Sequence, residues 1–552
     1  MEENHLDDTG VCDCHVFHPE DDQHRLLVFQ LLIGVVMKNK IAVFFISTFL
    51  ILMVSPVFNL ATRLPGHTDE NVKWWELSFL YNVDFAMPLL GSLYSMIGVS
   101  LDPGEVILGK DGWMFLGDDY VKSISVKRNG MTPQETSTVA KVADTQAKWD
   151  KWYKHHGVKQ YRVLIGPDKD SIYPEFLPRW AAHSADPVTA QLLKTAPPGV
   201  YVDAFTPLLA AKDKNPPMYY KTDTHWNNLG AWIAFTALGD SLRDADPKLV
   251  WPDPAYGKVT DILPQGGGDL AKFQRVQDST RDQNIALAFH HKFNITVDRY
   301  DYDSGTLLST NQNLPSEPPH HAQLLVSKDA LNDKKVLWLR DSYGIAMSPY
   351  MAATFSNVLQ VHHEALDSDG LIKLVERFKP DYVVYSVVER GSRIGLFVSP
   401  PELYAMSFNT DEFVPSAKGT VSLTNDVKPT KTAGRYDITG PDPFIVFSMA
   451  PLATGTKSHQ LTFDAQCFNP AEKRTPVQIF WSTPTEGFKE SNSARFFINQ
   501  GVTSVDISGA PGWPTTEQVV NVRFDIDSTT ACSGFSIKNL ATGVNVEAVS
   551  KK

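Results

Sequence analysis

Cysteine is scarce in this chain, and basic residues are outnumbered by acidic ones. Four of the 552 residues are cysteine, and 51 Lys and Arg stand against 63 Asp and Glu, a formal net charge of −12. This balance argues against nucleic-acid binding, which needs a basic surface, although it leaves room for a local basic cleft. No spacing of Cys and His resembles a zinc site, and we find no internal repeat. The length is sufficient for two or three domains.

Charge is missing altogether from one segment near the N-terminus. Residues 41–60 have no charged side chain, and such a run is long enough to cross a bilayer as a helix. Lys38 and Lys40 precede it, whereas Asp69 and Glu70 follow it. The positive-inside rule therefore predicts a cytoplasmic N-terminus and an exported body. We predict a signal anchor in the inner membrane, with the rest of the chain in the periplasm.

The ends of this segment leave alternatives open. The positions before Thr62 read Asn-Leu-Ala, a poor cleavage site, which favours an uncleaved anchor over a cleaved signal peptide and a soluble periplasmic protein. A buried core helix is a third interpretation. Residues 1–36 differ from the rest of the chain and are interpreted as a disordered tail or a mis-assigned start. Met37 followed by Lys-Asn-Lys would itself begin a signal anchor.

The exported part of the chain contains two cysteines, Cys467 and Cys532. Two lone cysteines in an oxidising compartment predict one disulfide, with a pair of buried thiols as the alternative.

Short apolar strands alternate with helices between residues 100 and 395. Lys110-Asp-Gly joins two apolar runs and predicts a hairpin, and Thr132-Pro-Gln-Glu predicts a capped helix start. The pattern further predicts strands at 163–165, 336–339, 358–361 and 382–388 and helices at 132–156, 344–355 and 366–378. Such alternation is typical of an α/β domain with a mostly parallel sheet covered by helices on both faces. Residues 252–325 are rich in Gly, Asp and His and are interpreted as a long insertion.

Helical periodicity disappears from about residue 415. Short alternating runs separated by Gly, Pro, Asn and Ser predict a β-sandwich over residues 415–552. Its aromatic side chains either stack on sugar rings, if exposed, or fill the core. They include Trp481, Phe488, Phe496, Phe497 and Trp513.

A reactive serine is predicted just after the strand at 336–339. Reactive groups of an open α/β sheet collect beyond the carboxyl ends of its strands, and Ser342 follows such an end. Backbone N–H groups of Ser342, Tyr343 and Gly344 could then face a developing oxyanion. The alternative is that Ser342 caps the next helix.

The segment Thr222-Asp-Thr-His-Trp-Asn-Asn supplies the partners that such a serine needs. His225 can act as its general base, and Asp223 can hold the imidazole in one tautomer. Asn227 or Asn228 is expected to cap the following helix. A polar turn with an exposed histidine is the alternative, and a metal site is weak because two ligands lack a third nearby.

These segments together resemble a known family. "TDTHWN" followed by "LRDSY", with "GKDGWMFLG" and "GPDKDSIYPEFLP" upstream, is similar to the SGNH hydrolase-like domain of the alginate O-acetyltransferases of the AlgJ and AlgX type, over residues 100–395. The resemblance implies a flavodoxin-like SGNH fold in circular permutation, because Asp-His precedes Ser here. It also implies that Ser342 carries the acyl group, His225 is the general base and acid, and Asp223 orients it. Tyr343 and Gly344 are then candidates beside the oxyanion.

Other polar residues are weaker candidates. Arg340 stands where SGNH esterases have Gly, so it either contacts substrate or forms a structural ion pair. Asn227, Lys169 and Arg390 are possible contacts at the same edge, although a lone loop lysine is usually solvated and Arg390 can pair with its neighbour, Glu389. The run 362–364, His-His-Glu, is a poor metal site because adjacent residues rarely ligate one metal together.

The predicted function is transfer of acetyl groups to hydroxyls of a secreted polysaccharide, through Ser342, without a cofactor. The resemblance implies a membrane-bound O-acyltransferase as the partner that supplies acetyl groups, and a carbohydrate-binding role for the C-terminal sandwich. An acetyl esterase with the same three residues and a non-catalytic polysaccharide-binding scaffold are the alternatives. The sequence does not identify the polymer.

Overall fold

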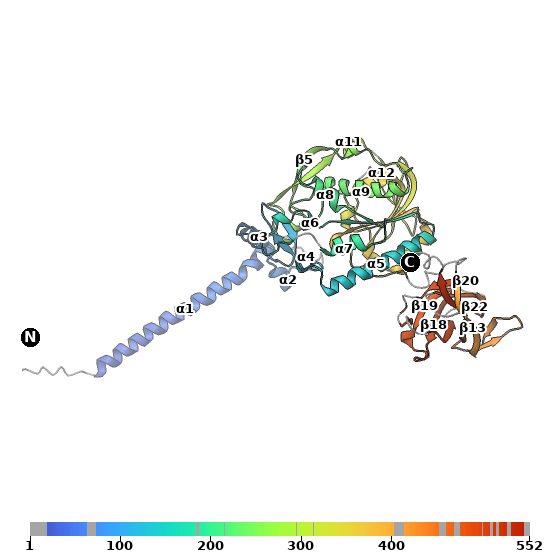
Figure 1. Cartoon of the computed structure of the whole chain (residues 1–552). Helices are drawn as coiled ribbons and strands as arrows, with labels where there is room; N and C mark the ends of the chain where they lie inside the picture. The colour runs from blue at the N-terminus through green and yellow to red at the C-terminus, as the bar shows by residue number, and fades with distance from the viewer. Residues whose placement is uncertain are drawn as a thin grey trace, which may run out of the picture. The chain divides into compact units, whose positions relative to one another are not determined.

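The computed structural model divides into two units, Met1–Ile97 and Gly98–Lys552 (Figure 1). The structure describes residues 19–62, 73–183, 187–214, 216–293, 295–312, 314–401, 413–451, 460–468, 475–498, 501–507, 510, 512–514, 518–526 and 532–545.

The first unit consists of helices α1 (Pro19–Thr62), α2 (Leu77–Leu80) and α3 (Met87–Met96). Within α1, the segment Met37–Thr62 is long and apolar enough to cross a membrane, which fits a signal anchor and a signal peptide alike. Near its end, the Asn59 side-chain amide donates hydrogen bonds to the carbonyls of Phe79 and Asn82, both at 2.9 Å. The tail predicted over residues 1–36 is helical from Pro19 onward, and residues 1–18 lie outside the described part.

The second unit begins with the predicted hairpin, β1 (Val106–Leu108) and β2 (Met114–Leu116). Asp111 and Gly112 at its tip both have positive φ, as a tight hairpin turn requires. The first long helix, α5 (Pro133–His155), starts as predicted, with the Thr132 hydroxyl accepting the Glu135 N–H at 3.1 Å.

An eight-stranded sheet forms the centre of the α/β domain, in the order β4-β3-β12-β10-β11-β9-β7-β8. The first five strands are parallel, and the last three are antiparallel additions. The parallel strands are β4 (Tyr201–Val202), β3 (Gln160–Gly166), β12 (Tyr382–Val388), β10 (Asn332–Arg340) and β11 (Phe355–His362). The predicted mostly parallel sheet is therefore confirmed.

Helices cover both faces of this sheet (Figure 1). Successive side chains of β3 point to opposite faces, so Val163 and Ile165 pack in one apolar cluster and Leu164 in another. The first cluster contains Trp149 of α5, together with residues of α7 (Pro187–Thr195) and α13 (Ser368–Phe378). The second contains Phe235 of α9 (Asn228–Ala245), together with residues of α12 (Ser348–Thr354). Burial on both faces explains the continuous apolar runs of the parallel strands.

The segment interpreted as an insertion is folded. It forms a two-stranded ribbon, β5 (Val259–Gly266) with β6 (Arg281–Leu287), joined by the short helix α10 (Asp269–Phe273). It also supplies the antiparallel strands β7 (Thr296–Asp301), β8 (Leu307–Gln312) and β9 (Gln323–Ser327). The sequence pattern missed these strands because most of their side chains are half-exposed or exposed.

In the described residues of the C-terminal region, ten antiparallel strands lie between Phe413 and Asn545. They are β13 (Phe413–Asn425), β14 (Val427–Pro429), β15 (Arg435–Ile438), β16 (Phe444–Pro451), β17 (Gln460–Phe468), β18 (Thr475–Ser482), β19 (Ser493–Ile498), β20 (Gly501–Asp506), β21 (Asn521–Ile526) and β22 (Gly534–Asn545). The rings of Phe463 on β17 and Phe524 on β21 meet at 5.3 Å although these strands are not neighbours. Two layers therefore enclose one core, as a sandwich requires.

The predicted disulfide joins Cys467 to Cys532, whose Cα atoms are 5.7 Å apart. Trp481 and Trp513 are buried in the sandwich core, so the core-filling alternative holds for both, whereas Phe488 is 37% exposed. The side chains of Phe496 and Phe497 lie outside the described part of the structure.

Candidate functional site

The serine turn follows β10 directly. Residues Ser342–Gly344 form a single 3-10 turn that Asp341 caps, with its Oδ1 accepting the Tyr343 N–H at 2.9 Å. The other carboxylate oxygen accepts the Val388 N–H at 2.7 Å, at the end of β12. Asp341 therefore fixes the turn to two parallel strands at their carboxyl ends, the edge at which the sequence placed it.

The histidine loop comes from a distant part of the chain and meets this turn. The Nε2 atom of His225 lies 2.7 Å from the Ser342 Oγ, and its Nδ1 lies 2.6 Å from the Asp223 Oδ1. The same Asp223 oxygen accepts the His225 backbone N–H at 2.9 Å. The structure thus brings together the three residues that the sequence singled out, in an order of contacts that suits proton transfer from the serine hydroxyl.

Charge stabilises the protonated form of His225. Burial opposes that form, but the hydrogen bond and the negative charge of Asp223 outweigh burial, and they raise the pKa of the imidazole. In turn, although burial favours the neutral acid, the hydrogen bond from His225 lowers the pKa of Asp223 to about 2. A neutral imidazole beside an ionised carboxylate is the arrangement that a general base needs.

Lys169 binds the backbone of the histidine loop. This residue begins α6 (Lys169–Ile172) just after β3, and its ammonium donates to the carbonyls of Tyr220, Lys221 and Asp223 at 2.9, 3.0 and 2.7 Å. Burial lowers the pKa of Lys169 to about 8. The Lys169 side chain is buried, and its ammonium donates all three of these hydrogen bonds to the backbone of the histidine loop. The prediction that this lysine faces a cleft is therefore wrong, and so is the alternative that it is solvated.

The two motifs also contact each other away from the reacting atoms. The Tyr343 hydroxyl donates to the Thr224 carbonyl, and the Trp226 indole N–H donates to the Tyr343 carbonyl, both at 2.9 Å. A Cβ on Gly166 would lie 2.7 Å from the Tyr343 ring, so only glycine allows β3 to end this close. Tyr343 therefore packs beside the histidine.

A cavity of about 230 Å³ opens onto Ser342 and His225. Its polar wall includes Tyr220, Asn228 and Asn284, of which Asn284 comes from β6 of the insertion. Asp223, Trp226, Pro315, Ser342, Tyr343, Ile345, Ala346 and His225 complete the lining. Among these described residues, Asp223 and His225 are the ionisable pair, and the rest of the wall is uncharged at neutral pH. A larger hollow of about 580 Å³ lies along α9, away from the serine.

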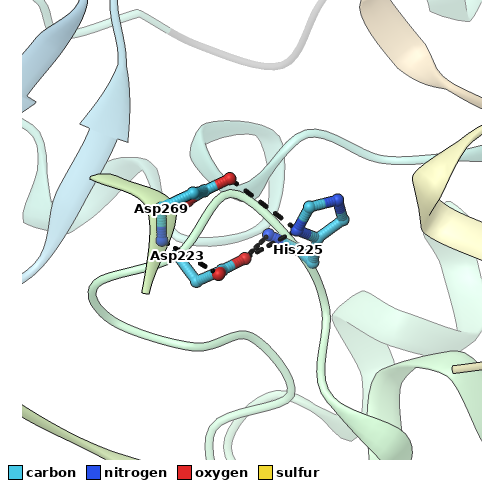
Figure 2. Close-up of side chains that lie close together, drawn as sticks. All are labelled: Asp223, His225 and Asp269. Carbon is cyan, nitrogen blue, oxygen red and sulfur yellow. Dashed lines mark hydrogen bonds and ion pairs between the residues drawn. The ribbon is translucent and has the colours of Figure 1, made fainter. Parts of the chain in front are cut away.

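A second carboxylate, which the sequence did not single out, lies beside the imidazole. Asp269 opens α10, and its Oδ2 is 3.9 Å from the His225 Nδ1 (Figure 2). Asp223, His225 and Asp269 are also the described side chains whose ligand atoms, within 4.8 Å of one another, could hold a metal ion together. Since Asp223 already accepts a 2.6 Å hydrogen bond from Nδ1, a cation there would have to displace that proton.

The comparisons with known proteins match this domain. Residues 106–315 match the family described as "SGNH hydrolase-like domain, acetyltransferase AlgX". The chain is 25% identical to the probable alginate O-acetylase AlgJ of Pseudomonas syringae pv. tomato over 252 residues, which are 43% of this chain and 61% of the relative. The corresponding Pseudomonas aeruginosa protein is 29% identical over 203 residues, 35% of this chain and 48% of the relative. The solved structure of Pseudomonas aeruginosa AlgX has a TM-score of 0.34 at 10% identity and covers 80% of this chain and 94% of its own.

The α/β domain is therefore similar to the SGNH hydrolase-like acetyltransferases of the AlgX/AlgJ family, whose model covers residues 106–315. The match spans less than two thirds of the length of these AlgJ relatives.

Arg340, which stands where ordinary SGNH esterases have Gly, does not line the cavity at Ser342 and His225. Its side chain is fully buried, and it donates hydrogen bonds to the Gln360 side chain at 3.0 Å and the Ser316 carbonyl at 2.6 Å. A Cβ on Gly344 would lie 2.6 Å from the Arg340 side chain, which explains a glycine at the end of the turn. Arg340 therefore supports the serine turn from within the sheet, rather than contacting substrate.

Four more residues that were predicted to contact substrate or the oxyanion have partners within the domain. Asn227 caps α9 by accepting the N–H groups of Leu229 and Gly230 at 3.0 and 3.3 Å. Arg390 pairs with Asp168, and its guanidinium lies 6.0 Å from the centre of the Tyr343 ring. The N–H groups of Tyr343 and Gly344 are both directed at Asp341, so these two proposed oxyanion donors are occupied within the turn.

A buried ion cluster lies below the AlgX-like site. The Lys127 ammonium contacts the carboxylates of Asp168, Asp170 and Glu389 at 3.3, 2.6 and 3.4 Å. Asp168 and Asp170 follow β3, and Glu389 follows β12. The cluster therefore links the carboxyl ends of these two neighbouring strands. The sequence missed it because the partners lie about 40 and 220 positions apart along the chain.

Proposed function

We propose that the protein is an O-acetyltransferase that moves acetyl groups to hydroxyls of a secreted polysaccharide through an acetyl-Ser342 intermediate. The observation that carries this proposal is the pair of short contacts that link Ser342 to His225 and His225 to Asp223, at 2.7 and 2.6 Å, in a domain similar to those of the AlgX/AlgJ family.

In the first half-reaction, the His225 Nε2 removes the proton of the Ser342 hydroxyl as its oxygen attacks the acetyl carbonyl. Asp223 keeps the Nδ1 proton in place and stabilises the imidazolium that forms. Collapse of the tetrahedral intermediate expels the donor's leaving group, which takes the proton from His225. The product is an acetyl ester on Ser342 and a neutral imidazole.

In the second half-reaction, a sugar hydroxyl enters the same cavity. His225 removes its proton, the alkoxide oxygen attacks the acetyl-serine carbonyl, and Ser342 leaves with the proton returned to it. Water would give hydrolysis by the same route, so transfer requires that the acceptor exclude it. Trp226, Pro315 and Ile345 on the cavity wall favour a partly dry site.

The cavity limits what enters. At about 230 Å³ it is smaller than the roughly 300 Å³ at which sites for drug-sized ligands begin, so it fits an acetyl group with one sugar unit and leaves the rest of the polymer outside. Tyr220, Asn228 and Asn284 offer uncharged polar groups to that unit. The relatives are named alginate O-acetylases. We propose an acceptor of this class, whose hydroxyl-bearing face enters the cavity while any carboxylate stays outside.

Location and partners complete the proposal. The apolar helix segment Met37–Thr62 supports an anchor in the inner membrane with the acetyltransferase domain in the periplasm. A membrane-bound O-acyltransferase would supply the acetyl groups, and the C-terminal sandwich would hold the polysaccharide. No cofactor is needed for the two half-reactions.

The test uses the full chain in detergent with a chromogenic acetyl ester, with and without oligosaccharide acceptors, beside Ser342→Ala. We expect ester cleavage that depends on Ser342 and acetylated oligosaccharide as a product. Acetate release that no acceptor alters would indicate an esterase instead. Unchanged acetylation of the secreted polymer in cells that carry Ser342→Ala would indicate a non-catalytic subunit.

A further inference from the structure

Asp269 is the one carboxylate beside His225, in the part of the chain that the structure describes, that the triad does not use (Figure 2). It comes from the ribbon of the insertion, more than forty residues after the histidine loop. Its side chain is 33% exposed, so it is not sealed in the core.

The backbone at Asp269 binds the Asp223 carboxylate. The Asp269 N–H donates to the Asp223 Oδ2 at 3.1 Å, whereas the other oxygen of Asp223 serves His225. A Cβ on Gly268 would lie 2.3 Å from the Asp223 Cβ, so only glycine permits this approach. Both oxygens of Asp223 are thereby fixed, and the Asp223 carboxylate cannot rotate away from the imidazole without breaking a hydrogen bond.

The Asp269 carboxylate accepts two hydrogen bonds from Thr224, the residue between Asp223 and His225. It accepts the Thr224 N–H at 2.7 Å on Oδ1 and the Thr224 hydroxyl at 2.5 Å on Oδ2. The Thr224 Oγ1 lies 3.2 Å from the His225 Nδ1. Asp269 therefore holds the residues on the Nδ1 side of the imidazole through charge-assisted hydrogen bonds, which are about twice as strong as neutral ones.

The charges that face His225 come from three elements. Asp223 and Asp269 favour the protonated imidazole, and Arg390 opposes it from below the Tyr343 ring. The Ser342 hydroxyl and the Tyr343 ring, with centroids of Tyr343 and His225 5.4 Å apart, complete the surroundings. Two carboxylates against one buried cation leave a net negative environment around Nδ1.

We propose that Asp269 is a positioning residue that makes a second acidic partner for His225, so that the site operates as Ser342, His225 and two aspartates. It holds Thr224 and Asp223 in place, and its charge stabilises the imidazolium formed when Ser342 is deprotonated. This inference rests on the proposed acyl chemistry of Ser342. The competing view is that Asp269 merely begins α10, where its Oδ1 also accepts the Leu270 N–H at 2.7 Å.

The test compares Asp269→Asn with Asp278→Asn, which removes the same charge from an exposed position of the same ribbon. The full chain in detergent is treated with a phenylmethylsulfonyl fluoride probe, and the rate of Ser342 modification is followed across pH. For Asp269→Asn we expect an approximately tenfold slower reaction, equivalent to the loss of one hydrogen bond to a charged group, and an acid limb moved to lower pH. Asp278→Asn should match the wild type. If Asp269→Asn left both the rate and the acidic side of its pH profile unchanged, the inference would be overturned. If Asp269 only capped α10, its replacement would lower thermal stability without shifting the pH profile.

A second measurement separates this inference from the proposed function. The imidazole of His225 is titrated by NMR after selective 15N labelling of histidine, with His225→Gln to assign the signal. If the wild type fails to react with the probe, the proposed function fails, but a lower pKa of His225 in Asp269→Asn would still support the contact. An identical titration in both proteins would contradict it.

A double-mutant cycle tests whether Asp269 works through His225. Asp223→Asn leaves Asp269 as the remaining carboxylate near Nδ1, so we expect Asp269→Asn to slow Ser342 modification more in that background than alone. Rate losses that simply multiply would show that the two aspartates act independently, and would overturn the proposal.

Discussion

The serine turn and the histidine loop meet at one point but are built in different ways. The turn is three residues long, and its cap, Asp341, is the adjacent residue and contacts the neighbouring strand. The loop from Tyr219 to Asn228 is held by Lys169 and by carboxylates of the insertion. Strand pairing positions the serine, whereas side chains from elsewhere position the histidine. Substitutions far along the chain should therefore affect the histidine much more than the serine.

The largest effect is expected for Lys169→Met. It removes the donor of three loop carbonyls at once, and each buried group left without a partner costs about 1–3 kcal/mol. We expect a loss of about 3 kcal/mol or more in the free energy of unfolding, and Ser342 modification slowed by about 100-fold or more because the carbonyl of Asp223 is released. Chemical denaturation and the probe rate measure the two effects.

Lys154→Met provides the control for this substitution. Lys154 is largely exposed and pairs with Asp150 on the surface of α5. Such a pair contributes about 0–1 kcal/mol, so both measurements should stay close to the wild type. If Lys169→Met reacted as fast as Lys154→Met, the loop would not depend on its buried lysine.

This contrast also explains what the sequence could predict. The hairpin at Asp111, the start of α5 and the strand before Ser342 follow from local rules of capping, turns and periodicity, and the structure has all three. The triad partners were chosen for their chemistry, and the structure brings them together. Their supports were not predictable, because nothing near Lys169 in the sequence indicates that a loop fifty residues later will bind its ammonium.

The insertion shows the same limit. Its polar, Gly-rich composition predicted a long insertion and singled out no site residue in it, yet the segment contributes Asn284 to the cavity and places Asp269 beside the histidine. Polar side chains that line a surface cleft produce no hydrophobic periodicity, so the sequence pattern does not reveal them. Arg340 is the converse case. A charged residue beside the serine predicted either a substrate contact or a structural ion pair, whereas its hydrogen-bond partners are the Gln360 side chain and the Ser316 carbonyl.

A smaller effect is expected for Asp341→Ala, which breaks the serine turn locally. The N–H groups of Tyr343 and Val388 lose their acceptor, at a cost of about 1–3 kcal/mol for a buried group. We expect Ser342 modification to slow by about tenfold, while β10 keeps its place between its neighbours. Asp367→Ala is the control, because it removes the cap of α13 by the same chemistry at a distance from the cavity. Equal probe rates in the two variants would show that the cap does not position the serine.

The pH dependence of the wild type distinguishes the two regions without any substitution. His225 must be neutral to take the serine proton, and its pKa is raised by Asp223. The rate of Ser342 modification should therefore rise with pH through a midpoint above about 6.5, the ordinary value of histidine. The stability that the paired imidazolium contributes is present below that ordinary value and is lost as pH rises through the raised pKa. A midpoint below 6.5 would contradict the arrangement of charges around the loop.

The smallest effect on the site is expected from removing the disulfide, in a variant that combines Cys467→Ala with Cys532→Ala. The bond closes a sequence separation of 65 residues within the sandwich, so its loss should lower the free energy of unfolding by about 2–4 kcal/mol. Neither the turn nor the loop has a partner there among the contacts described above, so Ser342 should react at the wild-type rate in protein that remains folded. A double Cys→Ala variant that melts earlier yet keeps the rate and the acid limb would show that the reacting set is fixed within the α/β domain. A slower reaction at a temperature where the sandwich is still folded would instead mean that the histidine loop depends on the sandwich as well.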